Sequence, residues 1–392
     1  MNHTIIALIL LTISITNTNC KHINGTLEDK RLNFTGFALK YAGAVAEYDV
    51  TTEDGYILKL FRIPGDKTKP VLLMHGLLCS SNDFIIRGND SLAITLAHAG
   101  YDVWLSNYRG NMHSRRHHTR NPDTDASFWR FGPYEHGYYD LATSIDFVLN
   151  KTKERSLSLI GHSEGMLITY ILGAERPEYN DKIKIVIALA PACHLEQISL
   201  RLPKIEQIGS ILINFLKLHN IEEFLGFNTV SGKMLRNFCS DRFLGNDMCR
   251  QFFLFAFGFD PEGLEPSFIP TIFNNFPAGT SRQNIEHSIQ FISSGKFKQF
   301  DYGPITNFIK YGSEVPPEHD LKKVTMKMYI IAAKNDKLSV IEDNGLQAKE
   351  LPNVEEYIII ENELFNHMDF IWGRHTPKLL HYRILEILKK YN

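Results

Sequence analysis

The chain has 392 residues, of which 42 are lysine or arginine and 44 are aspartate or glutamate, so its formal net charge is only −2. This near-neutral balance gives no electrostatic reason to expect nucleic acid as a partner. With only five cysteines at this length, the fold must depend on a hydrophobic core rather than on disulfide bonds.

Residues 1–20 have the pattern of a signal peptide. Ile5 to Ile15 form an apolar run that is too short to span a bilayer, and Thr18 and Cys20 suit cleavage after Cys20. We therefore predict export, with no transmembrane segment, because nothing else approaches 18 uninterrupted apolar residues. Four N-x-S/T sequons support a glycosylated, exported chain: Asn24, Asn33, Asn89 and Asn150.

Cleavage at this position leaves four cysteines: Cys79, Cys193, Cys239 and Cys249. Four cysteines permit three complete pairings. The closeness of Cys239 and Cys249 in the sequence favours a bridge between them. The alternative, buried thiols throughout, is reasonable above all for Cys79 and Cys193.

A β-hairpin is predicted in the first part of the chain. Residues 47–63 predict a hairpin, because two alternating, β-rich runs flank Glu53-Asp54-Gly55. Short apolar runs then alternate with glycine-bearing loops and helical stretches, of which residues 140–151 are one. Runs of this kind are typical of strands buried on both faces of a parallel sheet: residues 71–74, 102–105, 157–160 and 185–189.

This alternation stops after the fourth run. From Pro191 to about Lys322 the sequence is helical and irregular, and residues 200–310 hold 17 of the 26 phenylalanines. Strand-like runs return at 328–333 and 354–360, and a last helix is expected at about 378–390. We predict an α/β fold with a mostly parallel sheet, in which residues 21–192 and 322–392 form the core and residues 193–321 form a mainly helical insertion.

A catalytic site is indicated by LIGHSEGML, residues 159–167. Ser163 lies between two glycines in the G-x-S-x-G pattern that presents a nucleophilic serine on a sharp strand-to-helix turn. A serine hydroxyl needs a base, and the base needs an orienting acid. In this fold the chain order is serine, acid, histidine, each after a strand, which predicts Asp336 as the acid and His367 as the base.

Other residues compete for these roles. Asp343 and Asp369 are the rival acids, at the start of a predicted helix and beside the base. His75 and His162 flank the site but come too early in the chain to be the base. The oxyanion needs two backbone N–H donors, which we predict from Glu164, the residue after the nucleophile, and from Leu77 in MHGLL.

Several long motifs in the same order resemble the acid lipase family of gastric and lysosomal lipases, within the α/β-hydrolase superfamily. The resemblance runs from about Tyr48 to the C-terminus and includes TTEDGYIL, HGLL, AGYDVWLSNYRGN, PAGTS, GKFKQFDYG, NDKL and NHMDFIWG. It implies hydrolysis of water-insoluble esters, namely acylglycerols or sterol esters, by a secreted or lysosomal enzyme.

The resemblance also implies roles for particular residues. It assigns Ser163, Asp336 and His367 as the triad and Leu77 and Glu164 as oxyanion donors. It makes the insertion a cap with a mobile lid, supports a Cys239–Cys249 bridge within it, and implies no cofactor or metal. Independently, the sequence contains no H-E-x-x-H, no paired C-x-x-C and no complete phosphate loop.

Glu164 departs from the family, which usually has glutamine at this position. An ionised carboxylate facing the site would repel the oxyanion that forms beside it. We consider three explanations: the side chain pairs with Arg109, or it is protonated at an acidic working pH, or it is a solvated substitute without consequence. Two further departures lie near the site, at Met166 and at residues 339–341.

Four functions fit the sequence. A lipid-ester hydrolase is favoured, because an insertion rich in phenylalanine suits an oily interface, although many of these rings must form the core of the insertion itself. The alternatives are a carboxylesterase for small soluble esters, a non-catalytic lipid carrier and an acyltransferase. A damaged triad would mark a carrier, and the triad here is complete. An acyltransferase would need water excluded from its acyl-enzyme.

Overall fold

The computed structural model describes residues 32–201, 204–241 and 244–391. The predicted signal peptide and the Asn24 sequon lie outside these residues. Within them, no helix has both the length and the apolar character needed to cross a membrane.

An eight-stranded sheet forms the centre of the molecule, with the strand order β1-β2-β4-β3-β5-β6-β9-β10. All neighbours from β4 to β10 are parallel, whereas β1–β2 and β2–β4 are antiparallel. The mostly parallel sheet and its N-terminal hairpin are therefore confirmed. The strands are β1 (Ala46–Thr51), β2 (Ile57–Ile63), β3 (Asp66–Met74), β4 (Tyr101–Leu105), β5 (Leu157–His162), β6 (Ile183–Leu189), β9 (Met328–Ala333) and β10 (Val354–Ile360).

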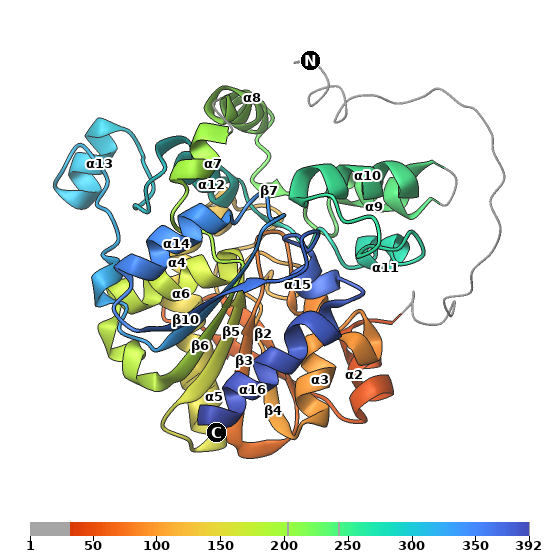
Figure 1. Cartoon of the computed structure of the whole chain (residues 1–392). Helices are drawn as coiled ribbons and strands as arrows, with labels where there is room; N and C mark the ends of the chain where they lie inside the picture. The colour runs from red at the N-terminus through yellow and green to blue at the C-terminus, as the bar shows by residue number, and fades with distance from the viewer. Residues whose placement is uncertain (1–31, 202–203, 242–243, 392) are drawn as a thin grey trace.

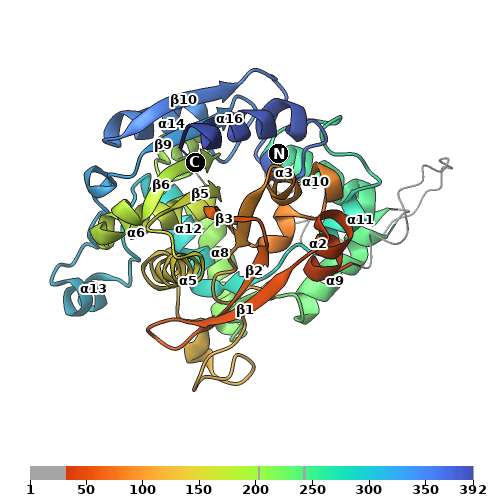
Figure 2. The ribbon, with the colours of Figure 1, turned by 90° about the horizontal axis from the view of Figure 1, so that it is seen from below.

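Helices cover both faces of this sheet (Figures 1 and 2). The helices that belong to these layers are α2 (Phe34–Ala42), α3 (Leu92–His98), α4 (Pro133–Glu135), α5 (Ala142–Thr152), α6 (Glu164–Glu175), α14 (Ile341–Glu350), α15 (Asp369–Trp372) and α16 (Tyr382–Tyr391). The two helices that the sequence predicts at 140–151 and at about 378–390 are present, and each follows a π-helical segment: His136–Leu141 precedes α5, and Pro377–His381 precedes α16.

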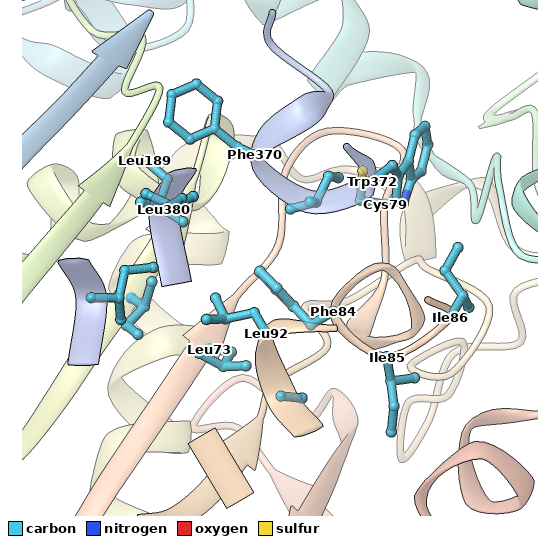
Figure 3. Packing of buried hydrophobic residues seen from close by; sticks show 14 of the residues in the cluster. Leu73, Cys79, Phe84, Ile85, Ile86, Leu92, Leu189, Phe370, Trp372 and Leu380 are labelled. Atoms are coloured by element: carbon cyan, nitrogen blue, oxygen red, sulfur yellow. The ribbon is translucent and has the colours of Figure 1, made fainter. Parts of the chain in front are cut away.

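The sheet separates two hydrophobic clusters. Successive residues of a central strand belong to opposite clusters, since Leu73 packs with α3 and α16 whereas Leu72 and Met74 pack with α5 and α6. Figure 3 shows part of the first cluster, where Leu73 and Leu92 lie near Phe84. Burial on both faces explains why these strands read as unbroken apolar runs rather than as alternating ones.

Between β6 and β9 the chain leaves the sheet and forms helices over the carboxyl ends of the strands (Figure 1). A two-residue pair, β7 (Glu223–Phe224) and β8 (Thr280–Ser281), is the only sheet among the described residues of this segment. Its helices are α7 (Glu196–Arg201), α8 (Ile205–Leu218), α9 (Val230–Ser240), α10 (Gly245–Phe257), α11 (Ile269–Phe273), α12 (Arg282–Ser294) and α13 (Pro304–Tyr311).

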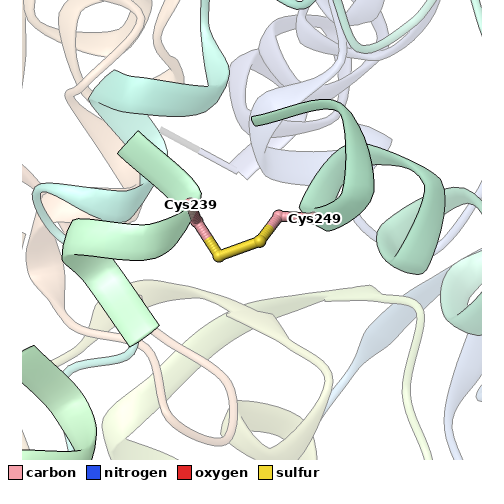
Figure 4. The surroundings of a disulfide bond; sticks show 2 residues. All are labelled: Cys239 and Cys249. Atoms are coloured by element: carbon pink, nitrogen blue, oxygen red, sulfur yellow. A yellow bond between two sulfur atoms is a disulfide. The ribbon is translucent and has the colours of Figure 1, made fainter. Parts of the chain in front are cut away.

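A disulfide joins Cys239 of α9 to Cys249 of α10, with a Cα–Cα distance of 5.6 Å (Figure 4). Cys79 and Cys193 are buried thiols. The pairing that sequence proximity favours is therefore present in the structure. The bridge holds two helices of the insertion side by side.

Candidate active site

Ser163 occupies the sharp turn between β5 and α6. Its backbone has φ 54° and ψ −121°, a region that non-glycine residues rarely adopt and that the surrounding structure must enforce. The turn is fixed by backbone hydrogen bonds, since Ser163 N donates to Leu189 O (3.0 Å) and Met166 N donates to Ser163 O (2.9 Å). The side chain is half-buried and lies at the carboxyl end of the central strand.

The glycines on either side of this serine are required by close packing. A Cβ on Gly165 would lie 2.5 Å from Met74 O and 2.8 Å from His75 O, which are backbone atoms at the end of β3 and at the start of the loop after it. A Cβ on Gly161 would lie 2.6 Å from Met166 Sδ. The G-x-S-x-G pattern thus reflects the approach of α6 to the neighbouring loop as well as the turn itself.

We expect Gly165→Ala to destabilise the protein and to reduce its activity. The new methyl group would meet two backbone oxygens that cannot rotate away, and overpacking of this kind costs roughly 1–3 kcal/mol. Gly345→Ala is the matched control, because Gly345 is also helical but its added Cβ would be 3.9 Å from the nearest atom. That change should be neutral or stabilising by up to about 1 kcal/mol. Urea denaturation of both variants measures the difference, and equal stability would contradict the packing argument.

The structure brings the three predicted triad residues together. His367 Nε2 lies 2.9 Å from Ser163 Oγ, and His367 Nδ1 lies 2.8 Å from Asp336 Oδ2. Asp336 follows β9 and His367 follows β10, so all three are at the same edge of the sheet. Because an ionised carboxylate only accepts, Nδ1 carries the histidine proton and Nε2 is free to accept from the serine hydroxyl.

The predicted acid, Asp336, is held in place by its second oxygen. Asp336 Oδ1 accepts from the backbone N–H groups of Leu338 (2.8 Å) and Ser339 (2.7 Å). The rival acids are engaged elsewhere, since Asp343 accepts from Gln197 N at the start of α7 and Asp369 accepts from Asn366 N. Neither rival forms a hydrogen bond with the His367 ring in the described structure.

His162 contributes a contact that sequence reasoning missed. Its Nε2 lies 3.0 Å from His367 O, and its ring centroid lies 4.8 Å from that of His367. Burial holds the pKa of His162 well below the usual range, so the ring is neutral and donates this hydrogen bond to the carbonyl. The only signal in the sequence is its position directly before Ser163.

The end of α10 contacts the loops that carry the acid and the base. Phe257 O accepts from Lys337 N and from His367 N, both at 3.4 Å. Asn366 Nδ2 donates to Gly258 O at 2.9 Å. At Gly258, φ is +127° and a Cβ would lie 2.0 Å from Asn335 O, so only glycine fits there. The stretch Phe252–Phe259 thus has an exposed part and a part that is fixed to the loops after β9 and β10.

The segment predicted to supply the second oxyanion donor passes close to the nucleophile. A Cβ on Gly76 would be 3.2 Å from Ser163 Cβ, and Leu77 follows directly. Leu77 also packs beneath α8, against Ile213 and Leu216. Glu164 is the first residue of α6, where backbone N–H groups have no acceptor within the helix and the helix dipole favours negative charge.

The hypothesis that the Glu164 side chain forms an ion pair with Arg109 is wrong. The Arg109 guanidinium donates instead to Asp54 (Nη1–Oδ2, 2.5 Å) and to Asp140 (Nε–Oδ1, 2.8 Å). The explanation by solvation is also wrong, since Glu164 is buried. Its Oε2 lies 2.9 Å from the Tyr108 hydroxyl. Burial raises the pKa of Glu164 to about 7, against smaller opposing effects of Asn284 and Tyr108.

In the part of the chain that the structure describes, no group of three His, Cys, Asp or Glu side chains is placed to hold a metal ion.

Comparison with known proteins agrees with this geometry. The family model of the α/β hydrolase fold matches residues 69–373, and that of the partial α/β-hydrolase lipase region matches residues 38–88. Among solved structures, a putative lipase from Sulfolobus solfataricus superposes with a TM-score of 0.61 at 14% identity, covering 89% of this chain and 94% of the other. The chain is therefore an α/β hydrolase.

Three curated relatives define the family more closely. Lipase 1 of Drosophila melanogaster is 36% identical, over 93% of this chain and 81% of its own length. Gastric triacylglycerol lipase of Rattus norvegicus is 35% identical, over 87% of this chain and 88% of its own length. Lysosomal acid lipase/cholesteryl ester hydrolase of Macaca fascicularis is 34% identical, over 88% of each chain. The chain belongs to the acid lipase family of α/β hydrolases, and it is a carboxylic ester hydrolase of the lipase type.

Proposed function

We propose that this protein hydrolyses the carboxylic esters of neutral lipids, acylglycerols or sterol esters, through an acyl-enzyme on Ser163. The observation that carries the proposal is the continuous hydrogen-bonded series from Asp336 through His367 to Ser163 Oγ on a strained turn. The substrate class is supported by relatives whose names specify a triacylglycerol lipase and a cholesteryl ester hydrolase.

In this mechanism Ser163 Oγ attacks the ester carbonyl carbon while His367 Nε2 takes the hydroxyl proton. The carbonyl oxygen becomes an oxyanion, which the backbone N–H groups of Leu77 and Glu164 stabilise. Asp336 orients the His367 ring and stabilises the imidazolium that forms when the ring takes this proton. The proton then passes from His367 to the leaving alcohol, and water attacks the acyl-enzyme by the reverse sequence, releasing the fatty acid and restoring the serine hydroxyl.

The surface of the insertion supports lipid substrates over small soluble esters. Large apolar side chains are exposed along four of its helices, and an exposed apolar surface of this kind suits an oily interface. We interpret residues 193–321 as a cap that controls access to the site. The exposed side chains include Ile211, Phe215 and Leu218 of α8, Val230, Met234 and Phe238 of α9, Met248, Phe252 and Phe255 of α10, and Ile305, Phe308 and Ile309 of α13.

We expect replacement of Phe252 and Phe255 by serine to reduce hydrolysis of emulsified long-chain esters much more than hydrolysis of a soluble short-chain ester. These side chains are 51% and 67% exposed, so their loss removes apolar area from the surface without opening the core. Activity on emulsions should fall by about thirtyfold, because each of the two exposed phenylalanines contributes on the order of 1 kcal/mol at a lipid surface.

The neighbouring Phe253 provides the control. It is 3% exposed and packs against Phe273, Phe276 and Trp372. Phe253→Ala should therefore lower the free energy of unfolding by roughly 3–5 kcal/mol and reduce activity on both substrates alike. Equal losses on both substrates in the Phe252/Phe255 variant would show that these rings too are part of the cap core.

A substrate panel tests the proposed function as a whole. Emulsified triacylglycerol, a sterol ester and a soluble short-chain ester are compared from acid to neutral pH. Preference for the soluble ester favours the carboxylesterase alternative, and transfer of the acyl group to an added alcohol in place of water favours an acyltransferase. A fluorophosphonate probe with peptide mapping completes the test, because a lipid carrier would leave Ser163 unlabelled.

We further propose that the enzyme acts outside the cell or in the lysosome. Three predicted glycosylation sites, Asn33, Asn89 and Asn150, have exposed side chains in the structure, and the relatives include a gastric and a lysosomal lipase. Expression in secretory cells, followed by removal of N-linked glycans, tests both points. A product that stays in the cytosol without glycans would contradict this proposal.

A further inference from the structure

The Tyr108 hydroxyl lies between two oxygen atoms next to the catalytic serine. It is 2.5 Å from the backbone oxygen of Gly76 and 2.9 Å from Glu164 Oε2. A phenol has one hydrogen to donate, so it cannot donate to both. The position of that hydrogen decides the protonation state of Glu164.

A carbonyl oxygen can only accept, and two oxygens 2.5 Å apart require a hydrogen between them. Tyr108 therefore donates to Gly76 O. The contact between Tyr108 and Glu164 then needs a hydrogen from the carboxyl side, which means that Glu164 is protonated. Within the described residues, Glu164 Oε1 has no hydrogen-bond partner, because the nearby Asn284 amide donates to Thr280 Oγ1 (3.0 Å) instead. An ionised carboxylate left half-paired in a buried site would be costly.

The groups around this contact are neutral as well. The Tyr108 ring lies between the rings of His75 and His136, with both centroid distances 4.1 Å. Burial lowers the pKa of His75 to about 3 and that of His136 well below the usual range, and it raises the pKa of the Cys79 thiol. His136 Nδ1 is 3.9 Å from Glu164 Oε1. No charged partner is therefore available to stabilise an ionised Glu164.

Gly76 O belongs to the same peptide group as the N–H of Leu77. Besides Tyr108, this oxygen accepts from His75 Nδ1 (3.0 Å) and from Cys79 N (3.2 Å). The His75 proton is on Nδ1 because Asn111 Nδ2 donates to Nε2 (3.1 Å). Donors on the carbonyl fix the plane of the peptide and polarise its N–H, which makes that N–H a stronger donor.

We propose that Glu164, in its protonated form, acts through Tyr108 as a positioning residue that orients and polarises the Gly76–Leu77 peptide for the oxyanion. This inference rests on the proposed function, in which the Leu77 N–H binds the oxyanion. It gives the side chain of Glu164 a role that is separate from that of its backbone N–H. It also explains why glutamine, usual in the family at this position, is chemically equivalent, because its amide donates to Tyr108 at every pH.

Ionisation of Glu164 reverses these contacts. Its proton is lost to solvent, and the Tyr108 hydrogen turns to the carboxylate, which is the stronger acceptor. Gly76 O loses its shortest hydrogen bond, and a negative charge appears beside the site where the oxyanion forms. Since burial raises the pKa of Glu164 to about 7, catalysis should decline as the pH rises through this value.

The test is the pH dependence of kcat for a soluble short-chain ester in the full-length protein. We expect the wild type to lose activity above about pH 7. Glu164→Gln should raise the ratio of kcat at about pH 8 to kcat at about pH 5 by tenfold or more, because the amide does not ionise. Tyr108→Phe should lower kcat mainly below about pH 7, where Tyr108 donates to Gly76 O, with little change in KM. In the Tyr108→Phe background the glutamine should alter the pH profile less than it does alone, because only the repulsion by the ionised carboxylate then remains for it to remove.

Asp83→Asn is the matched control, because Asp83 is also buried, with its pKa raised to about 7, but it bonds to Ser80 N rather than to Tyr108. Its pH profile should resemble that of the wild type. A Glu164→Gln profile that coincides with the wild type, or an Asp83→Asn variant that shifts the decline, overturns the inference. Failure of the proposed function looks different, since Ser163 would then be unlabelled by fluorophosphonate and all variants would be inactive.

Discussion

Ser163→Ala is expected to reduce ester hydrolysis by several orders of magnitude while the protein remains folded. The substitution removes only the hydroxyl that lies 2.9 Å from His367 Nε2, and it keeps the Cβ that already fits the turn. Without a nucleophile, the remaining acceleration comes from the oxyanion donors and from substrate binding, roughly 10³–10⁴-fold over water. Hydrolysis of a soluble ester and covalent labelling by a fluorophosphonate measure the loss.

A serine outside the site provides the control for this variant. Ser288 lies in α12, where its hydroxyl donates to Asn284 O. Ser288→Ala should retain labelling and turnover, because its hydroxyl contacts neither the ester nor the base. Substantial hydrolysis by purified Ser163→Ala would require another nucleophile and would remove the basis of the proposed mechanism.

The sheet was predictable from the sequence because its central strands are buried on both faces. Residues 185–189 read as an unbroken apolar run and residues 157–160 as one interrupted only by Ser158, and a proline or glycines soon after each run mark the carboxyl edge of a parallel sheet. Loops that follow parallel strands meet at this edge, whatever their separation in the chain. That rule is why Asp336 and His367 could be placed beside Ser163 without any local signal linking them.

The contacts of buried polar side chains were not predictable in the same way. Arg109 follows Tyr108 in the chain, yet it turns towards Asp54 at the hairpin and Asp140 in the π-helical segment, which are 55 and 31 residues away. Tyr108 turns towards Glu164. Which neighbour faces the site depends on the path of the loop after β4, and a sequence motif does not reveal that direction.

The role of the phenylalanines in the insertion was likewise only partly predictable. The sequence shows that they are numerous, but their positions do not separate exposed Phe255 from Phe257, whose carbonyl accepts from the acid and base loops. Such backbone contacts carry no side-chain signature. The one local signal is Gly258, which no other residue can replace without meeting Asn335 O.

The second large effect is expected from Asp336→Asn, which should lower kcat by about 10⁴-fold, the scale known for loss of the orienting acid in a serine triad. The reason lies in the hydrogen bonds of the two carboxylate oxygens. Oδ1 accepts from two backbone N–H groups, those of Leu338 and Ser339, and Oδ2 accepts from His367 Nδ1. An asparagine has one acceptor oxygen and one donor nitrogen to satisfy these three donors.

The asparagine oxygen should remain with the two backbone donors, because turning it away would leave both unpaired in a buried loop. The amide nitrogen then faces His367 Nδ1, which must accept, so the ring proton moves to Nε2. In that tautomer Nε2 cannot take the proton of Ser163, although the fold is intact.

Asp343→Asn is the control, since the partners of Asp343 are backbone N–H groups at the start of α7, and this variant should retain most activity. A larger loss in Asp343→Asn than in Asp336→Asn would transfer the acid role to the rival. Equal stability of the two variants in urea, together with unequal kcat, would show that the loss arises from the proton on the ring and not from unfolding.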